Sequence, residues 1–257
     1  MPVIFFDIGA TLADARVGPD GSLTLRPRPR VMAVLDALSD VRTGIISNPG
    51  PGDDAASRAA AALREAFPGR FTNEALVHWG PKDGRGIFDR AVAAAGEATA
   101  GDCVFVGEDA RERAFAREAG MRTAADPVFA RAATENRPVH RAWIELPDGR
   151  GLPELTATVN GTEAVVVRTV SERVVLAMVT TQGTEALERA GFPVDLQEPV
   201  DGEPVDDAER RASEKFIGDL LARGEAVYEG EQPTPRTTHI VTCEDDGRLT
   251  VRRLRFR

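Results

Sequence analysis

The stretch VIFFDIGATL, residues 3–12, decides the fold class of this chain. Its first four residues are large and apolar, which is typical of a strand that is buried on both faces. The apolar run ends abruptly at Asp7. A carboxylate at the C-terminal end of a buried strand is well placed to act as a nucleophile, so Asp7 is the first candidate for a catalytic residue.

After this strand, short apolar runs alternate with helical patterns as far as residue 120. Further strands are predicted over 42–48, 74–79 and 102–107. Helices are predicted over 30–40, 53–67, 86–96 and 111–120. Such alternation predicts an α/β fold, with a Rossmann-like parallel sheet that has helices on both faces.

Polar residues follow each of these predicted strands. They are Asp7, Ser47-Asn48, Lys82 and Glu108-Asp109. Because ligands bind at the carboxyl ends of the strands in parallel sheets, we expect these residues to share one site. Phosphoryl transfer through an acyl-phosphate needs this set: a carboxylate to attack phosphorus, a hydroxyl to hold the phosphoryl group, a lysine to offset charge, and further carboxylates for Mg²⁺.

The same residues resemble motifs of the haloacid dehalogenase (HAD) superfamily. The first motif of that family, hhhhDxDGTL, is similar to VIFFDIGATL at Asp7, Thr11 and Leu12. The second, an apolar strand that ends in Ser or Thr, is similar to GIISN and places Ser47.

The third and fourth HAD motifs also have counterparts in the chain. KDGRGIF resembles the third motif through Lys82 and the Ile-Phe pair that begins five residues later, and Lys82 is one of only two lysines in the chain. VFVGEDARERAFAREAG resembles the fourth through Glu108, Glu112 and the closing Ala-Gly. The four motifs follow one another in the family's order over roughly residues 1–130.

The resemblance implies a Mg²⁺-dependent phosphatase or phosphotransferase that forms an aspartyl-phosphate on Asp7. It implies catalytic roles for Asp7 and Lys82, and phosphate binding by Thr11, Ser47 and Asn48. The implied Mg²⁺ ligands are Asp7, Glu108, Asp109 and Glu112. The three acids after residue 107 have an alternative role, since acidic side chains also stabilise a helix N-terminus. Arg111 and Arg113 are interpreted as solvated residues of the helix surface, with contact to a substrate phosphate as the alternative.

Gly9 departs from the family pattern. In HAD phosphatases an acid two residues after the nucleophile protonates the leaving group and then activates water, and Gly9 has no side chain to do either. Three alternatives remain open. The protein is a phosphatase that is slow or takes the acid from elsewhere, or it runs carbon–halogen or carbon–phosphorus chemistry, or it is a degenerate member that binds a ligand or partner without turnover.

The large cap domains of the family are absent from the intervals between these motifs. Residues 13–30 have the pattern of a short hairpin. A HAD core without a cap often acts on large substrates, or is covered by another domain. We therefore expect a phosphorylated substrate, small or macromolecular, and a second domain that packs across the strand ends and contributes to substrate choice.

The second half of the chain is strand-rich, and we divide the chain into a HAD-like core, 1–132, and an α+β domain, 138–257, of unknown role. A linker is predicted at 126–140, and a loop at 194–209. An amphipathic helix is predicted over 206–224, with Ala212, Phe216 and Leu220 facing inward. Predicted strands cover 141–149, 155–161, 163–170 and 173–181, with a strand–turn–strand at 238–256. His140, Trp143, Tyr228 and His239 form no motif, and a protein partner of this domain is one open role.

Composition excludes several function classes. The net charge of −9 argues against general nucleic-acid binding. No apolar run is long enough to cross a membrane and no secretory leader is recognised, so the expected compartment is the cytoplasm. Cys103 and Cys243 are not expected to form a disulfide, and the three histidines are too scattered for a zinc site.

Overall fold

The computed structural model describes residues 1–18, 21–199, 216–243 and 249–254. At its centre lies a five-stranded sheet with the order β5-β4-β1-β6-β7. All four strand pairings in it are parallel. The predicted α/β class and parallel sheet are therefore confirmed. The strands are β1 (Val3–Phe6), β4 (Arg42–Ser47), β5 (Val77–Trp79), β6 (Cys103–Val106) and β7 (Arg122–Ala124).

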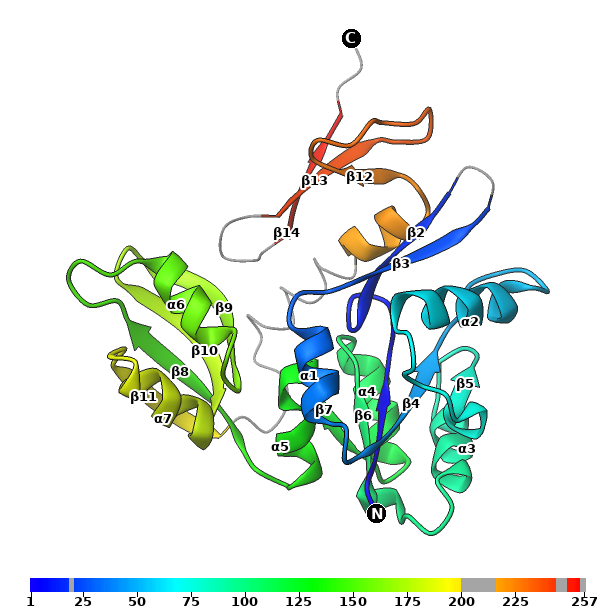
Figure 1. Ribbon diagram of the computed structural model, residues 1–257, viewed down its shortest axis with the longest axis horizontal. Helices are drawn as coiled ribbons and strands as arrows, with labels where there is room; N and C mark the ends of the chain where they lie inside the picture. The colour runs from blue at the N-terminus through cyan, green and yellow to red at the C-terminus, as the bar shows by residue number, and fades with distance from the viewer. Residues whose placement is uncertain (19–20, 200–215, 244–248, 255–257) are drawn as a thin grey trace.

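Helices cover both faces of this sheet (Figure 1). Ile4 and Phe6 of β1 belong to a core cluster that includes side chains of α1 (Val31–Ala37), α2 (Ala55–Ala66) and α5 (Ala130–Thr134). Val3 and Phe5 belong to a second cluster with α3 (Gly86–Ala94) and α4 (Ala110–Glu118). The alternation follows from the two-residue period of a strand, and it explains why every residue of β1 is apolar.

The segment that follows β7 is structured, and the predicted linker at 126–140 is wrong. Pro127–Phe129 form a 3₁₀ turn, for which the Asp126 side chain accepts a hydrogen bond from the Val128 N–H at 2.9 Å. This turn leads directly into α5, whose Ala130 and Ala132 are buried. Small apolar residues at this spacing pack against the sheet, although Pro and Asp give the sequence the look of a loop. Two other 3₁₀ turns, Glu74–Leu76 and Ala100–Asp102, precede β5 and β6.

The residues after 138 form two separate sheets in the described part of the chain. The first, which we call the antiparallel unit, has the order β11-β8-β10-β9. Its strands are β8 (Val139–Glu145), β9 (Ala164–Ser171), β10 (Val174–Thr180) and β11 (Val194–Pro199). The loop predicted at 194–209 is wrong at its start, because residues 194–199 form β11. The rest of that predicted loop lies outside the described residues.

Two helices, α6 (Leu152–Val159) and α7 (Thr181–Arg189), belong to the antiparallel unit. The strand predicted over 155–161 is wrong, because these residues lie mainly in α6. Leu155 and Val159 are both buried and lie four residues apart, on one helical face. At the start of α6, the Glu154 carboxylate accepts a hydrogen bond from the Gly151 N–H at 3.0 Å, which satisfies a backbone donor that the helix leaves open.

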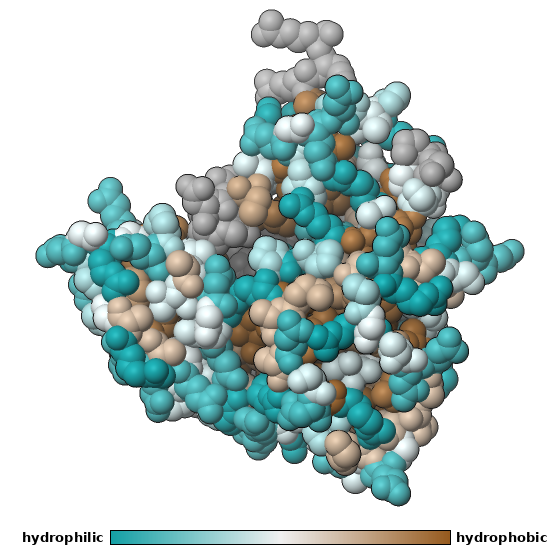
Figure 2. All heavy atoms as spheres, viewed as in Figure 1, coloured by the Kyte–Doolittle hydropathy of each residue, from teal (hydrophilic) through white to brown (hydrophobic). Residues whose placement is uncertain are grey.

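The antiparallel unit packs against the α/β unit through apolar side chains. Val167, Leu176 and Met178 share a core cluster with residues of β1 and α1, and hydrophobic atoms are visible along this junction in Figure 2. Arg30 at the start of α1 crosses the junction and donates to the carbonyl oxygens of Thr162 and Ala164.

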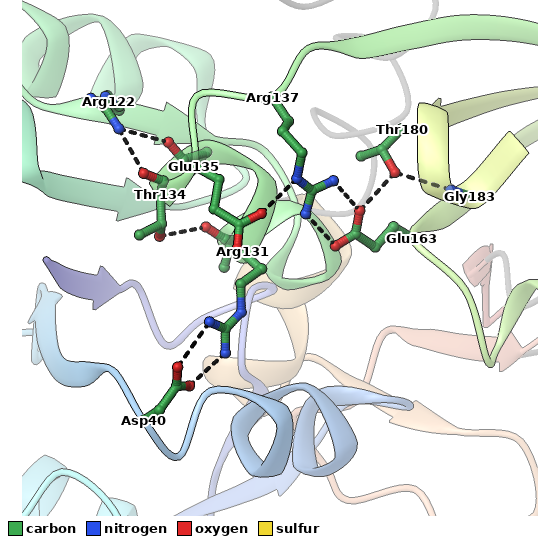
Figure 3. A network of polar contacts seen from close by, with 11 residues as sticks. Asp40, Arg122, Arg131, Thr134, Glu135, Arg137, Glu163, Thr180 and Gly183 are labelled. Carbon is green, nitrogen blue, oxygen red and sulfur yellow. Dashed lines mark hydrogen bonds and ion pairs between the residues drawn. The ribbon is translucent and has the colours of Figure 1, made fainter. Parts of the chain in front are cut away.

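A polar network holds the chain where it passes from α5 into β8. Figure 3 shows the Arg137 guanidinium between the carboxylates of Glu135 and Glu163, at 2.6 Å from each. Thr180 Oγ1 also donates to Glu163 at 2.7 Å. Burial alone would raise the pKa of Glu163, but the hydrogen bonds from Arg137 and Thr180 outweigh it and hold that pKa below its ordinary value.

The second sheet after residue 138, which we call the C-terminal unit, has the order β12-β13-β14. Its strands are β12 (Ala226–Tyr228), β13 (His239–Cys243) and β14 (Leu249–Arg253). Residues 216–222 are helical, whereas Ala212 and the Asp246-Gly247 turn lie outside the described residues. Leu220 is buried as predicted, but the inward placement of Phe216 is wrong, since Phe216 is 49% exposed.

The C-terminal unit docks on the hairpin of β2 (Ala13–Val17) and β3 (Leu23–Pro27), at the carboxyl ends of the central strands (Figure 1). Tyr228 Oη donates to Asp14 Oδ2 at 2.6 Å, and Arg16 pairs with Glu231 at 2.5 Å. The predicted second domain therefore consists of two parts. Its C-terminal unit lies over the strand ends, while its antiparallel unit packs beside α1.

Two further expectations concern the whole chain. Cys103 is buried, Cys243 is exposed, and the two form no disulfide. Among the described helices, none combines the length and the apolar character that crossing a bilayer requires.

Candidate active site

Except for Asp109, the polar residues that follow the central strands lie around one pocket of about 590 Å³. In the register of the sheet, Phe6 of β1 is level with Ile45 of β4 and with Val106 of β6, so the residues beyond these positions emerge side by side. The pocket is lined by Asp7, Ser47, Asn48, Lys82, Glu108 and Glu112, among others.

Asp7 is held from three directions. Its N–H donates to the Val106 carbonyl oxygen at 2.8 Å, which fixes the backbone against β6. Its Oδ1 accepts a hydrogen bond from Ser47 Oγ at 2.8 Å and pairs with Lys82 Nζ at 2.6 Å. The side chain is almost fully buried, so its carboxylate is presented to the pocket in a fixed orientation.

Lys82 connects Asp7 to a second carboxylate. Its ammonium lies 2.7 Å from Glu112 Oε2 and 5.7 Å from the centre of the Phe105 ring. Burial would lower the pKa of Lys82, but the negative charges of Asp7, Glu112 and Glu108 outweigh burial and raise that pKa above its ordinary value. Lys82 is therefore a permanent positive charge at neutral pH.

Glu108 and Thr11 form a reciprocal pair. Thr11 Oγ1 donates to Glu108 Oε2 at 2.7 Å, and the Glu108 N–H donates to Thr11 Oγ1 at 3.1 Å. Burial and the nearby charge of Asp7 raise the pKa of Glu108 to about 7. Its carboxyl group thus changes charge close to neutral pH, which is a common property of groups that handle protons or cations.

Two of the predicted site residues make local hydrogen bonds instead. Asp109 Oδ1 accepts from the N–H groups of Arg111 at 2.8 Å and Glu112 at 3.2 Å, so Asp109 is the N-cap of α4. Asn48 lines the pocket, but its Oδ1 accepts from the Gly50 N–H at 3.1 Å and stabilises the loop after β4.

The prediction that Arg113 is a solvated surface residue is wrong. Arg113 is buried, and its Nη1 donates to the Gly107 carbonyl oxygen at 2.6 Å. At Gly107 a Cβ would lie 2.8 Å from the Phe105 ring and 3.6 Å from the Asp7 Cβ, so a larger residue would clash with the Phe105 ring of β6. Gly107 and Arg113 together allow the turn between β6 and α4 to pass close to Asp7. Arg111, by contrast, is exposed, with its guanidinium over Phe115.

Gly9 lies in the loop between β1 and β2 and lines the pocket. No heavy atom of the described residues lies within 4 Å of the place where its Cβ would be. The next residue, Ala10, has a left-handed φ of 53°, and Arg28 donates to its carbonyl oxygen. The loop therefore has room for a side chain at residue 9, although the residue there is glycine.

The carboxylates of this pocket are the oxygen ligands that Mg²⁺ prefers. Asp7 and Glu108 would hold such a cation, since both are buried at the pocket and the negative charge of Asp7 raises the pKa of Glu108. Glu112 is paired with Lys82. Among the described residues, no group of three or more His, Cys, Asp or Glu side chains is arranged to hold a metal ion.

The pocket also contains residues that the sequence did not single out. From the C-terminal unit come Gly218, Asp219, Ala222 and Arg223, and from α2 and β5 come Arg58 and Trp79. Asp219 and Arg223 were part of a predicted amphipathic helix, but charged residues on such a helix usually face solvent. Only the long-range return of the chain to the β2–β3 hairpin brings them to the site.

Comparison with known proteins adds no relative to this picture. The chain matches no protein-family model and no curated protein. The geometry of the pocket is therefore the basis for a functional proposal.

Proposed function

We propose that this protein is a HAD-like hydrolase, a Mg²⁺-dependent phosphatase or phosphotransferase that forms an aspartyl-phosphate on Asp7. The observation that carries the proposal is the contact of one carboxylate oxygen with both the Ser47 hydroxyl and the Lys82 ammonium, at 2.8 Å and 2.6 Å. These contacts lie at the carboxyl end of a central parallel strand, where ligands bind in sheets of this type.

Each of these groups has a use in phosphoryl transfer. Asp7 would attack phosphorus and form an acyl-phosphate, which divides one difficult hydrolysis into two displacements. Lys82 offsets the negative charge of the nucleophile and of the incoming phosphoryl oxygens. Ser47 would donate to a phosphoryl oxygen, and its hydrogen bond to Asp7 supports this role. Thr11 orients Glu108 through their reciprocal hydrogen bonds.

A divalent cation suits the electrostatics of the pocket. Bound by Asp7 and Glu108, Mg²⁺ would reduce the repulsion between the phosphate and the carboxylates. The same charge would hold Glu108 in its ionised form, since a nearby cation lowers the pKa of a carboxyl group.

The dimensions of the pocket favour a small substrate over a macromolecular one. A volume of about 590 Å³ falls within the range of small-molecule sites. Its wall includes Leu23, Leu25 and Trp79, while Arg58 supplies a positive charge. We therefore propose a small phosphorylated molecule with an apolar part.

Binding of beryllium trifluoride, which mimics an acyl-phosphate, tests the proposal without knowledge of the substrate. We expect calorimetry to detect Mg²⁺-dependent binding to the wild type and none to Asp7→Asn. Asp102→Asn is a matched control, because Asp102 lies at the opposite end of β6 and caps a 3₁₀ turn there. Binding that persists in Asp7→Asn would place the anion elsewhere and contradict the proposed nucleophile.

A second candidate function is a HAD-fold binding or regulatory protein without turnover. Gly9 favours it, because the usual acid of the phosphatases is absent there. The two functions differ in their response to Asp7→Asn and to EDTA, both of which should abolish turnover by an enzyme. A binding protein would show no turnover in any form, and would retain a partner that can be isolated with it.

A further inference from the structure

Residues 216–222 form a helical roof over the candidate active site (Figure 1). A Cβ on Gly218 would lie 3.7 Å from the Cβ of Ala10, so the helix backbone contacts the same loop that contains Gly9. Gly218 and Asp219 line the pocket together with Asp7 and Lys82. The roof thus brings a carboxylate into the pocket from a distant part of the chain.

The helix that carries Asp219 is fixed by its neighbours. Ile217, Leu220 and Leu221 are buried in the core cluster of the C-terminal unit. That unit is in turn attached to the hairpin by the Tyr228–Asp14 hydrogen bond. Because both neighbours of the 218–219 pair are buried, the helix cannot rotate about its axis without exposing apolar surface.

The Asp219 carboxylate has no side-chain or backbone partner among the described residues. It is exposed, and within the described residues it makes no hydrogen bond and no ion pair. The acids that surround Lys82 differ in this respect, since Asp7 and Glu112 both contact its ammonium. A carboxyl group with no structural partner, on the wall of a site that lacks its usual acid, is available for proton transfer.

We propose that Asp219 is the general acid and base of this site and replaces the acid that Gly9 does not provide. The inference rests on the proposed function. In the first step the Asp7 carboxylate attacks phosphorus, the bond from phosphorus to the leaving oxygen breaks, and Asp219 gives its proton to that oxygen. In the second step water attacks phosphorus, Asp219 accepts a proton from the water, and the bond from phosphorus to Asp7 breaks to release phosphate.

The role of Asp219 in the first step predicts a dependence on the leaving group. The p-nitrophenolate ion leaves without a proton, whereas a primary alkoxide needs one. The ratio kcat/KM reports only the steps up to formation of the phospho-enzyme. In Asp219→Asn we expect kcat/KM for butyl phosphate to fall about 10²–10⁴-fold, and kcat/KM for p-nitrophenyl phosphate to change less than about threefold.

The role in the second step predicts a burst. Asp219→Asn should release one equivalent of p-nitrophenol per active site and then turn over slowly, because hydrolysis of the phospho-enzyme has lost its base. Glu229→Gln is the matched control, since Glu229 is an acid of the C-terminal unit that pairs with Arg252, and neither residue lines the pocket. It should keep the wild-type kinetics on both substrates.

A rescue variant separates chemistry from folding. Because residue 9 has open space around it, Gly9→Asp in the Asp219→Asn background should restore at least part of the lost activity on butyl phosphate. Equal losses on the two substrates, or none on either, would overturn the role of Asp219. If, in that case, Asp7→Asn still abolishes activity, the proposed function stands and only the role of Asp219 is rejected. Absence of both turnover and beryllium trifluoride binding in the wild type would overturn the proposed function itself.

Discussion

Lys82 is the residue on which the electrostatics of the pocket depend. Its ammonium contacts Asp7 and Glu112, and all three side chains are largely buried. Removing one partner of a buried ion pair is costly, because the remaining charge loses its compensation. The same pairing that would prepare Asp7 for catalysis therefore also stabilises the fold.

Lys82→Met should lower the free energy of unfolding by about 3–5 kcal/mol, since two buried carboxylates lose the cation that they face. Urea unfolding of the wild type and the variant measures this loss. The double variant Lys82→Met/Glu112→Gln should recover part of it, because one of the two negative charges is then absent. A single variant as stable as the wild type would mean that the ion pairs contribute nothing to stability.

Glu108 should make stability fall as pH rises. Its pKa is about 7 in the folded protein against 4.5 as the ordinary value, so between these pH values the folded state retains a proton that the unfolded state has released. In metal-free protein, the free energy of unfolding should fall by up to about 1.4 kcal/mol per pH unit more steeply in the wild type than in Glu108→Gln. Parallel pH profiles of the two proteins would contradict the raised pKa.

The sequence predicted which side chains come together where they directly follow a strand, while the roles of these residues stay predictions. Asp7, Ser47 and Glu108 come together because adjacent parallel strands place their ends at one edge, which is a local consequence of the alternation. Arg113 was misplaced because a charged helical residue usually faces solvent, and only the close turn at Gly107 gives it a buried carbonyl to bind. Asp219 was missed because no sequence signal specifies which surface a distant helix will cover.

At the scale of elements, the β2–β3 hairpin is the support on which the C-terminal unit rests. Tyr228 makes three of the contacts across this junction. Its hydroxyl donates to Asp14, and the guanidinium carbons of Arg16 and Arg26 lie 5.7 Å and 5.2 Å from its ring centre. Burial and the charge of Asp14 raise the pKa of the Tyr228 phenol, so it remains a donor throughout the neutral range.

Tyr228→Phe should loosen this contact while leaving the ring in place. Loss of a hydrogen bond to a carboxylate is expected to cost about 1.5–3 kcal/mol. Hydrogen exchange should accelerate in β12 and β13 and in residues 216–222, with little change in β1 and β6. Uniform acceleration across the chain, or none at all, would show that the hydrogen bond does not hold the roof in place.

The strand wrongly predicted over 155–161 has a clear physical cause. The segment 155–161 is rich in Thr and Val, which favour strands, yet Leu155 and Val159 face one apolar surface when the segment is helical. Tertiary packing of these two side chains therefore favours the helix over the strand. By contrast, β1 and β6 are apolar throughout and flanked by helical patterns, so only a buried parallel strand fits them.

At the scale of the whole molecule, the α/β unit and the antiparallel unit share a hydrophobic core. Each contains one of the two tryptophans of the chain, Trp79 at the end of β5 and Trp143 in β8. A continuous core couples the unfolding of its parts, so we expect one cooperative transition.

Single-tryptophan variants test this coupling. In Trp143→Phe the fluorescence reports on the α/β unit, and in Trp79→Phe it reports on the antiparallel unit. Within each variant, the fluorescence midpoint in urea should coincide with the midpoint from far-ultraviolet circular dichroism. A midpoint that differs between the two probes would show that the units unfold independently.

The hydrogen bond between Tyr228 and Asp14 also has a consequence for biosynthesis, because it joins residues 214 positions apart. At about 5–20 residues per second, the ribosome delivers Tyr228 roughly 10–40 s after Asp14. Strand β1 and Asp7 thus emerge long before the helix that roofs the pocket. A nascent chain can complete its central sheet while the pocket is still uncovered, and any activity that requires the roof begins only after residues 216–228 have been synthesised.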